Sequence, residues 1–123
     1  MTVLLIEPGM APRKAEIDGS LKGMQQVVGG YIQAIFPFDD PVALICNEEG
    51  KLQGLPLNRV LRDEEGNIFD IVAGTFFLCG APPDSDSFTS LEEAYLEKYH
   101  QRFSSPERVL RVNGRIVCLS MDD

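Results

Sequence analysis

Residues 41–80 constrain the fold most, because they hold most of the strand-forming residues around two similar turns. Each turn, at 47–50 and at 63–66, begins with a residue whose side chain bonds its own turn and ends with glycine. This is the pattern of a type I turn closed by a left-handed residue. Because apolar runs at 42–46 and 68–72 flank the turns, the stretch predicts an antiparallel meander.

Further strands and a first helix are predicted from local patterns. A short helix is expected over 21–28, where Ser20 is a good N-cap and Gly29 stands at the stop position. Gly23 in its interior weakens this prediction, because an interior glycine destabilises a helix by about 1 kcal/mol relative to alanine. Apolar runs or alternation predict further strands over 3–6, 14–17, 31–36 and 74–79.

A longer helix is predicted over 90–103, with Ser90 or Thr89 as its cap and an apolar stripe at three- to four-residue spacing. Beyond it, Asn113-Gly114 between two strand-like runs predicts a two-residue hairpin. Val112 should pair with Arg115. Both faces of this hairpin are partly apolar, so it must pack against another surface.

These elements predict an α+β fold, with a mainly antiparallel sheet of five to seven strands, one short helix and one longer helix. At 123 residues the chain is long enough to bury a core without disulfides or a metal. We expect an α+β core domain over 1–105. A C-terminal β-hairpin extension over 106–123 should pack on the core or on a second subunit, which makes a homodimer the expected assembly.

Charge and cysteine usage restrict the partners and the compartment. Nineteen acids against eleven bases give a net charge of -8, which disfavours direct DNA binding and attachment to anionic membranes. Cys46, Cys79 and Cys118 lie in apolar surroundings without a CxxC pair, so they should be small buried hydrophobes. Without a leader or a membrane-spanning run, the sequence predicts a cytoplasmic protein.

No catalytic motif is present, and His100 is the single histidine. We therefore predict no catalytic residue, no metal site and no cofactor, and expect His100 to lie at the surface. A hydrolase would need its carboxylates to converge, and most of the candidates occupy turns where solvated acids are common. These candidates are Asp39, Asp40, Glu48, Glu49 and Asp70.

A ligand site is predicted where Asn58 and Arg59 follow the kink at Pro56, because an amide and a guanidinium there offer a fork of donors to a carboxylate or phosphate. Glycine beside an aromatic ring elsewhere could wall a pocket for a planar group. The alternatives are Arg59 paired with a neighbouring acid, and rings packed in the core. The proposed ligand-binding residues are Asn58, Arg59, Tyr31, Gly30, Thr75 and Phe76, for a small anionic, nucleotide-like ligand.

Charged turns suggest a second kind of partner. The acidic tips could imitate nucleic acid toward a basic host defence enzyme, so an acidic protein-binding inhibitor or DNA mimic is the alternative function. The arginines near the C-terminus could instead meet an acidic partner surface or a second subunit. The proposed partner-binding residues are Glu48, Glu49, Glu64, Glu65, Arg111 and Arg115.

Several runs, in order and spacing, resemble a family of domains of unknown function: EIDGSL, VGGYI, CNEEGKL, LPLNR and DIVAGTFF. The likeness extends over about residues 2–103 and does not reach the final hairpin. The family is similar to small accessory proteins of bacterial phages, plasmids and conjugative elements, often found near antirestriction genes. The resemblance implies a cytoplasmic protein of a mobile genetic element that acts in counter-defence or maintenance, and it carries over no catalytic residue. Together with the residues above, this makes a non-enzymatic binding protein the predicted function.

Overall fold

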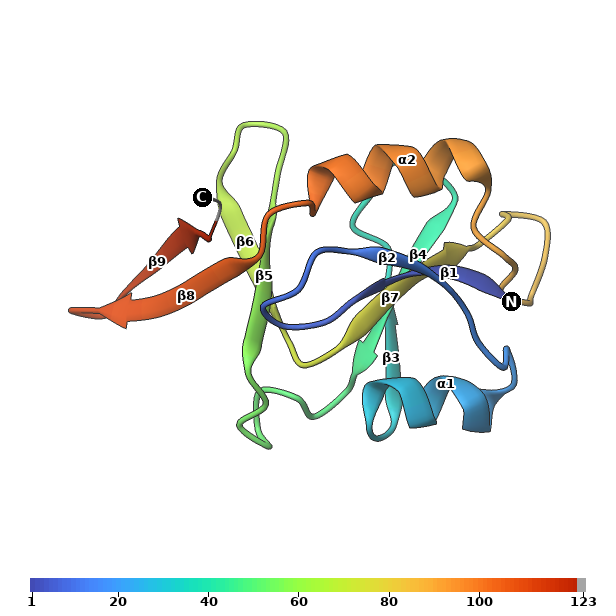
Figure 1. The fold of residues 1–123 in the computed structure, drawn as a ribbon, viewed down its shortest axis with the longest axis horizontal. Coiled ribbons are helices and arrows are strands. Elements are labelled where there is room, and N and C mark those ends of the chain that lie inside the picture. Colours follow the sequence, from blue (N-terminus) through green and yellow to red (C-terminus); the bar gives the residue numbers. More distant parts are fainter. Residues whose placement is uncertain (122–123) are drawn as a thin grey trace.

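Five strands form the central sheet of the computed structural model, which describes residues 1–121 (Figure 1). Their order is β2-β1-β7-β4-β3, and every neighbouring pair is antiparallel. The middle strands β7 and β4 are buried along their whole length, as their unbroken apolar runs require. The strands are β1 (Thr2–Ile6), β2 (Arg13–Glu16), β3 (Ile32–Ile35), β4 (Val42–Asn47) and β7 (Phe76–Gly80).

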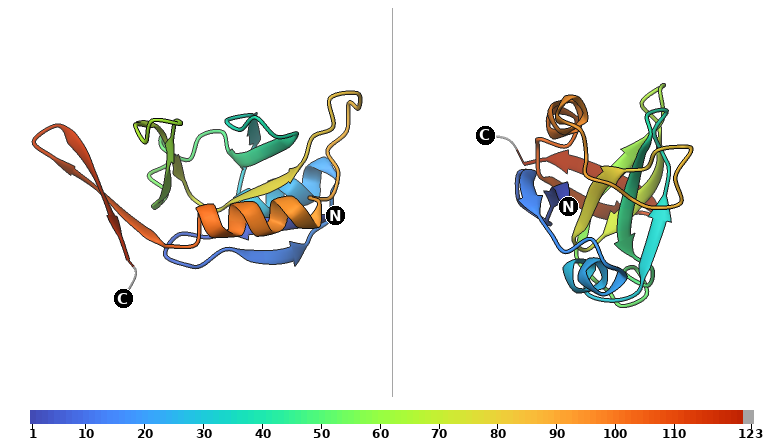
Figure 2. Two further views of the ribbon diagram at one scale, coloured as in Figure 1. Left: turned by 90° about the horizontal axis from the view of Figure 1, so that it is seen from above. Right: turned by 90° about the vertical axis from the view of Figure 1, so that its right-hand side faces the viewer.

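Two helices cover opposite faces of this sheet, α1 (Leu21–Val28) and α2 (Glu93–Arg102) (Figures 1 and 2). Alternate residues of each strand supply the two cores, since successive side chains of a strand point to opposite faces. Val3 and Leu5 pack under α1, whereas Leu4 and Ile6 pack under α2. The expected α+β class is therefore confirmed, with the sheet between the helices.

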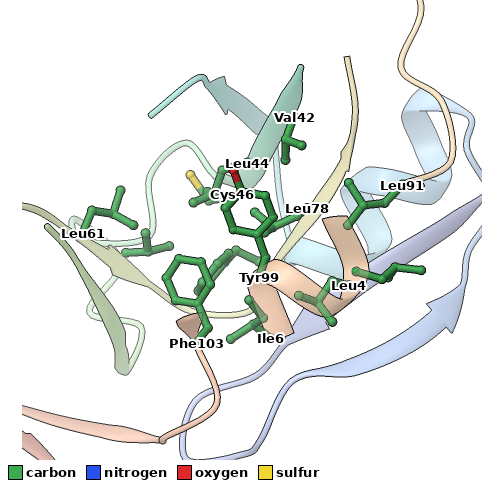
Figure 3. Packing of buried hydrophobic residues seen from close by; sticks show 13 residues of the cluster. Leu4, Ile6, Val42, Leu44, Cys46, Leu61, Leu78, Leu91, Tyr99 and Phe103 are labelled. Atoms are coloured by element: carbon green, nitrogen blue, oxygen red, sulfur yellow. The ribbon is translucent and has the colours of Figure 1, made fainter. Parts of the chain in front are cut away.

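The core under α2 holds the largest buried rings (Figure 3). Tyr99 and Phe103 point from the helix into the sheet, where Leu44 and Leu78 lie beneath them. Phe76 meets Phe103 edge to face, with ring centroids 5.9 Å apart. Because such ring pairs add to the gain from burial alone, α2 is fixed firmly on the sheet.

Helix α1 forms as its local signals predict. The Ser20 hydroxyl accepts a hydrogen bond from Gly23 N at 3.0 Å, and Gly29 ends the helix in the left-handed conformation, with φ 81°. Helix α2, in contrast, begins later than predicted. Thr89 forms an isolated bridge with Gly80, and the Ser90 hydroxyl accepts from Thr2 N at 2.9 Å, so neither residue caps the helix.

The predicted meander is wrong in its first half. Strand β4 pairs with β3 and β7, and the chain then leaves the sheet through a loop at 48–56. Strands β5 (Leu57–Arg62) and β6 (Ile68–Ala73) form a hairpin of their own across the turn at 63–66. There Gly66 is left-handed at φ 85°, as that turn requires, but Gly50 is not left-handed and the first turn does not join two paired strands.

The C-terminal hairpin is confirmed in its register. Strands β8 (Glu107–Val112) and β9 (Arg115–Ser120) pair as predicted, Val112 opposite Arg115, across a turn in which Asn113 and Gly114 both have positive φ. The hairpin projects beside β5, away from the central sheet (Figure 2). Asp122 and Asp123, the last residues of the predicted extension, lie outside the described residues.

Candidate functional site

The Arg59 side chain lies in the protein interior, with a relative exposure of 1%. Its guanidinium makes five hydrogen bonds, which matches its five N–H groups. The acceptors include the carbonyl oxygens of Phe103 and Met10 and the side-chain oxygen of Asn58. Burial lowers the pKa of Arg59. Within residues 1–121 it forms no ion pair, so the expected neighbouring acid is replaced by backbone carbonyls.

Asn58 is equally buried and joins three parts of the chain. Its amide nitrogen donates to the carbonyl oxygens of Ile6 and Gly74, both at 2.9 Å, while its oxygen accepts from Arg59 at 2.8 Å. These bonds engage the donors that the sequence suggested for an anion. Asn58 and Arg59 therefore join β1, β5 and the end of α2, and they offer solvent no fork of donors.

The other predicted ligand residues lie in two places. Gly30 and Tyr31 line a hollow of about 250 Å³, and Tyr31 is 69% exposed. Thr75 is half-buried, and Phe76 is fully buried in the core under α2. The six residues consequently do not form one pocket, because Gly30 and Tyr31 line that hollow without the other four, and Asn58, Arg59 and Phe76 are buried.

The two pairs of predicted partner-binding glutamates also lie apart from each other. Glu48 and Glu49 begin the loop that leads from β4 to the start of β5, whereas Glu64 and Glu65 lie in the turn that follows β5. All four are exposed. The length of β5, roughly 20 Å for six residues, lies between the two pairs. Arg111 and Arg115 are exposed on the C-terminal hairpin.

Two of the five candidate hydrolase carboxylates have lysine partners. Asp40 accepts from Lys98 at 2.5 Å, and Asp70 accepts from Lys51 at 2.7 Å. Asp40 also accepts from the Tyr99 hydroxyl at 2.6 Å. These donors lower the pKa of Asp40. Across residues 1–121, no three His, Cys, Asp or Glu side chains are grouped so that they could hold a metal ion.

Cysteine placement follows the prediction in two of three cases. Cys46 and Cys79 are buried, and burial raises the pKa of Cys79 to about 12. Cys118 is only half-buried, because it lies on the C-terminal hairpin, and its thiol contacts Glu107 at 3.1 Å. His100 is exposed on α2, as expected.

A better candidate site is a hollow of about 510 Å³ between α2 and the β5–β6 hairpin, which we call the helix hollow. Three chain segments build it: the loop before β4, the β5–β6 hairpin around its turn, and α2. Its volume is in the range of small-molecule sites. Its main side chains are Phe38, Asp39, Arg62, Asp63, Glu64, Phe69, Lys98, Tyr99 and Arg102.

Two arginines bring positive charge to the helix hollow, whose lining also carries the acids Asp39, Asp63 and Glu64. Arg62 donates to the carbonyl oxygen of Gly66 at 2.9 Å, and Arg102 donates to that of Arg62 at 3.1 Å. Within residues 1–121 neither guanidinium is in an ion pair, whereas Lys98 is neutralised by Asp40. Both guanidinium groups thus keep donors for an anion.

Aromatic rings flank these cations. The guanidinium of Arg102 lies 5.0 Å from the centre of the Phe38 ring, and Phe69 is 53% exposed on β6. Stacking on Phe38 holds the Arg102 side chain in place. The exposed face of Phe69 is a surface on which another planar group could lie.

Acids at the rim complete the electrostatics of the helix hollow. The carboxylate of Asp63 accepts from Glu65 N at 3.0 Å and Asn67 N at 2.9 Å, so the turn occupies it. Asp39 and Glu64 are exposed at the edge. Carboxylates there would accept from N–H groups of a ligand and would repel a ligand of high negative charge.

Sequence reasoning missed the helix hollow, although one signal was present. Lys98 and Arg102 are four residues apart in a predicted helix, which places them on the same side. The sequence does not reveal that the turn at 63–66 and Phe38 lie opposite them, because β5 and β6 leave the central sheet. The site is therefore formed by segments that are distant in the sequence, and no local sequence pattern predicts it.

Fold and hollow together define a small α+β domain with a polar, partly aromatic site between a helix and a hairpin. A family model for a domain of unknown function (DUF3846) matches residues 1–104, and the chain belongs to that family. No curated protein and no solved structure matches the chain. The matched region ends just before β8, so the C-terminal hairpin lies beyond it. Neither helix of residues 1–121 has the length and apolar character needed to cross a bilayer.

Proposed function

We propose that this chain is a non-enzymatic binding protein that holds a small anionic, nucleotide-like ligand in the helix hollow. The observation that carries the proposal is the pair Arg62 and Arg102, two guanidinium groups without ion-pair partners in the described chain, beside the exposed ring of Phe69. Guanidinium groups suit phosphate because their N–H groups match its oxygens. A planar base would stack on the ring.

The rim acids favour a mononucleotide over a polyphosphate. Asp39 and Glu64 can accept hydrogen bonds from the N–H groups of a base, while their charge opposes additional phosphates. The cellular setting of the proposal is a cytoplasmic accessory protein of a mobile genetic element that acts against host defence. Its support is the resemblance to phage, plasmid and conjugative-element proteins.

Isothermal titration with GMP, AMP, guanosine and inorganic phosphate tests the ligand class. We expect one of the two nucleotides to bind more tightly than its separate parts. Arg62→Gln and Arg102→Gln should each weaken binding roughly tenfold or more, since a hydrogen bond to a charged group contributes about 1.5–3 kcal/mol. Arg115→Gln, an exposed arginine at the tip of the C-terminal hairpin, is the matched control.

Failure of both nucleotides to bind, or binding that survives the double variant Arg62→Gln/Arg102→Gln, would rule out this site. If a nucleotide is instead consumed, and Asp40→Asn or Asp70→Asn abolishes turnover, the protein is a carboxylate-based hydrolase. Retained far-ultraviolet circular dichroism shows that each variant is folded.

The second candidate function is an acidic inhibitor or DNA mimic of a host defence enzyme. Its supporting observation is the exposure of four glutamates, Glu48 and Glu49 in the loop before β5 and Glu64 and Glu65 in the turn after it. Binding to a basic nuclease or methyltransferase should weaken when either pair is changed to lysine. Affinity that is unaffected by both changes excludes this function.

A further inference from the structure

A second hollow, of about 410 Å³, lies between the core domain and the C-terminal hairpin. We call it the hairpin hollow. Its walls are mainly apolar: Leu55, Leu57 and Ile71 come from the core domain, and Val109, Leu110 and Ile116 come from β8 and β9. It shares no lining residue with the helix hollow. The two hollows are therefore separate sites.

The hairpin is held at a fixed place beside β5, so this hollow is a built feature. The carboxylate of Glu107 accepts from Val60 N at 2.8 Å, and β8 packs along β5. Pro106 accepts from Met121 N at 2.7 Å, which closes the base of the hairpin. These contacts anchor one end of β8, while the apolar walls farther along remain open and Leu57 stays 40% exposed.

The open apolar walls of the hairpin hollow favour a ligand with an apolar part, because both surfaces would be removed from water. Burial of apolar area stabilises a complex by roughly 25 cal/mol for each Å² removed from water. A chain of methylene groups could cover Leu57 and Ile116 together, since one lies on each wall. A strongly polar ligand would lose its water here without acquiring partners.

The hairpin hollow is lined by two cations, Lys51 and Arg111, and their surroundings determine which ligand charge it would favour. Lys51 is paired with Asp70 at 2.7 Å, so its charge is largely compensated. Arg111 is exposed, and within residues 1–121 its side chain has no hydrogen-bond or ion-pair partner. An apolar site with a single uncompensated guanidinium is complementary to one anionic group attached to an aliphatic tail.

We propose that the hairpin hollow binds a medium-chain aliphatic carboxylate, with the chain between Leu57 and Ile116 and the carboxylate on Arg111. This site requires the C-terminal hairpin, which lies beyond the family region. Binding there is independent of a nucleotide in the helix hollow. The two activities can therefore be lost separately.

Titration of the full chain with sodium octanoate, followed by calorimetry, tests the proposal. Octanoate should bind, butanoate should bind at least roughly tenfold more weakly, and 1-octanol should show a similar loss because it lacks the charge. Arg111→Gln should weaken octanoate binding roughly tenfold. Arg108→Gln is the matched control, because Arg108 lies on the same strand but on the opposite face of the hairpin.

Ile116→Ser removes part of the apolar wall and should also weaken octanoate binding, while GMP and AMP titrations stay as in the unmodified protein. If millimolar octanoate produced no heat of binding, the proposal would be overturned. The hollow would then be better suited to apolar side chains of a partner protein. Equal losses for Arg108→Gln and Arg111→Gln would also overturn it, because they would indicate non-specific attraction of an anion.

Discussion

Arg59 donates two hydrogen bonds to the carbonyl oxygen of Phe103, at 3.2 and 3.0 Å, across 44 positions of sequence. The last four carbonyl groups of a helix lack partners within the helix, and a cation near them also complements the helix dipole. Arg59 thus joins β5 to the residue that ends α2. Arg59, which the sequence suggested for ligand binding, instead connects two elements inside the protein.

The first prediction concerns the stability that this link provides. Arg59→Met should lower the free energy of unfolding by about 3 kcal/mol or more, because it leaves the buried carbonyl oxygen of Phe103 and the buried side-chain oxygen of Asn58 without donors. Urea denaturation measures the change. Arg13→Met is the control: its exposed ion pair with Glu7 should contribute less than about 1 kcal/mol. Unaltered stability of Arg59→Met would contradict the structural role.

The second prediction separates that role from ligand binding. Arg59→Lys keeps a charge but cannot reach the same set of carbonyls, so the protein should be less stable yet still folded. Its affinity for a nucleotide in the helix hollow should equal that of the unmodified protein. Calorimetry on the folded variant measures this. A selective loss of affinity would restore Arg59 to the ligand site.

The third prediction concerns acid stability through Asp40. Hydrogen bonds from Lys98 and Tyr99 hold the pKa of Asp40 below its ordinary value of 3.8. A depressed carboxyl pKa stabilises the folded state above the unfolded pKa, and this stabilisation is lost as the pH falls through the folded pKa. Asp40→Asn should therefore be less stable than the unmodified protein near pH 6.

The gap between the two urea midpoints should narrow as the pH is lowered below about 4, because protonation removes the advantage of the carboxylate. Asp84→Asn, in the exposed loop before α2, serves as the control and should track the unmodified protein. A gap that stays constant over this pH range would show that Asp40 stabilises the fold only through the shape of its side chain.

Local sequence signals were sufficient wherever neighbours in the chain determine the structure. Ser20 and Gly29 marked the two ends of α1, and Asn113-Gly114 fixed the pairing of β8 with β9. Each signal acts through hydrogen bonds or backbone conformations within a few residues. No distant part of the chain is needed to form them.

Distant contacts explain what the sequence could not show. The turns at 47–50 and 63–66 look alike, but the Asn47 amide donates to the carbonyl oxygen of Val28 at 3.2 Å. A Cβ on Gly50 would lie 2.8 Å from the carbonyl oxygen of Ala73. Contacts with α1 and β6 therefore shape the first turn. The helix hollow depends on the same long-range course of the chain.

The fourth prediction reverses an expectation from helix propensity. Alanine is usually favoured over glycine inside a helix by about 1 kcal/mol. At Gly23, however, an added Cβ would lie 2.6 Å from the Asp18 Cβ and would also collide with the Asp18 carbonyl oxygen. Asp18 accepts from Ser20 N, so moving it would disturb the N-cap of α1.

Gly23→Ala should consequently lower the free energy of unfolding by about 1–3 kcal/mol. Gln26→Ala, at an exposed position of the same helix, should instead raise it by a few tenths of a kcal/mol, which isolates the steric effect from propensity. Thermal unfolding of the two variants provides the measurement. A gain in stability at both positions would disprove the steric argument.

The last prediction concerns the outer face of the C-terminal hairpin. Val112 and Leu119 are 48% and 49% exposed there, and Arg108 and Arg115 flank them. The chain as a whole has a net charge of -8, so the basic hairpin of one copy complements the acidic body of another. A reciprocal arrangement about a two-fold axis would cover both hairpins.

We therefore expect light scattering at high protein concentration to give twice the chain mass of 13.6 kDa. Leu119→Asp should shift the equilibrium to the monomer, because it places an acid in the apolar face, and high salt should do so partly by screening the arginines. Leu21→Asp changes an equally exposed leucine on α1 and should leave the dimer intact. A monomer at every concentration would contradict this prediction and would show that the outer face of the hairpin does not bind a second copy of the chain.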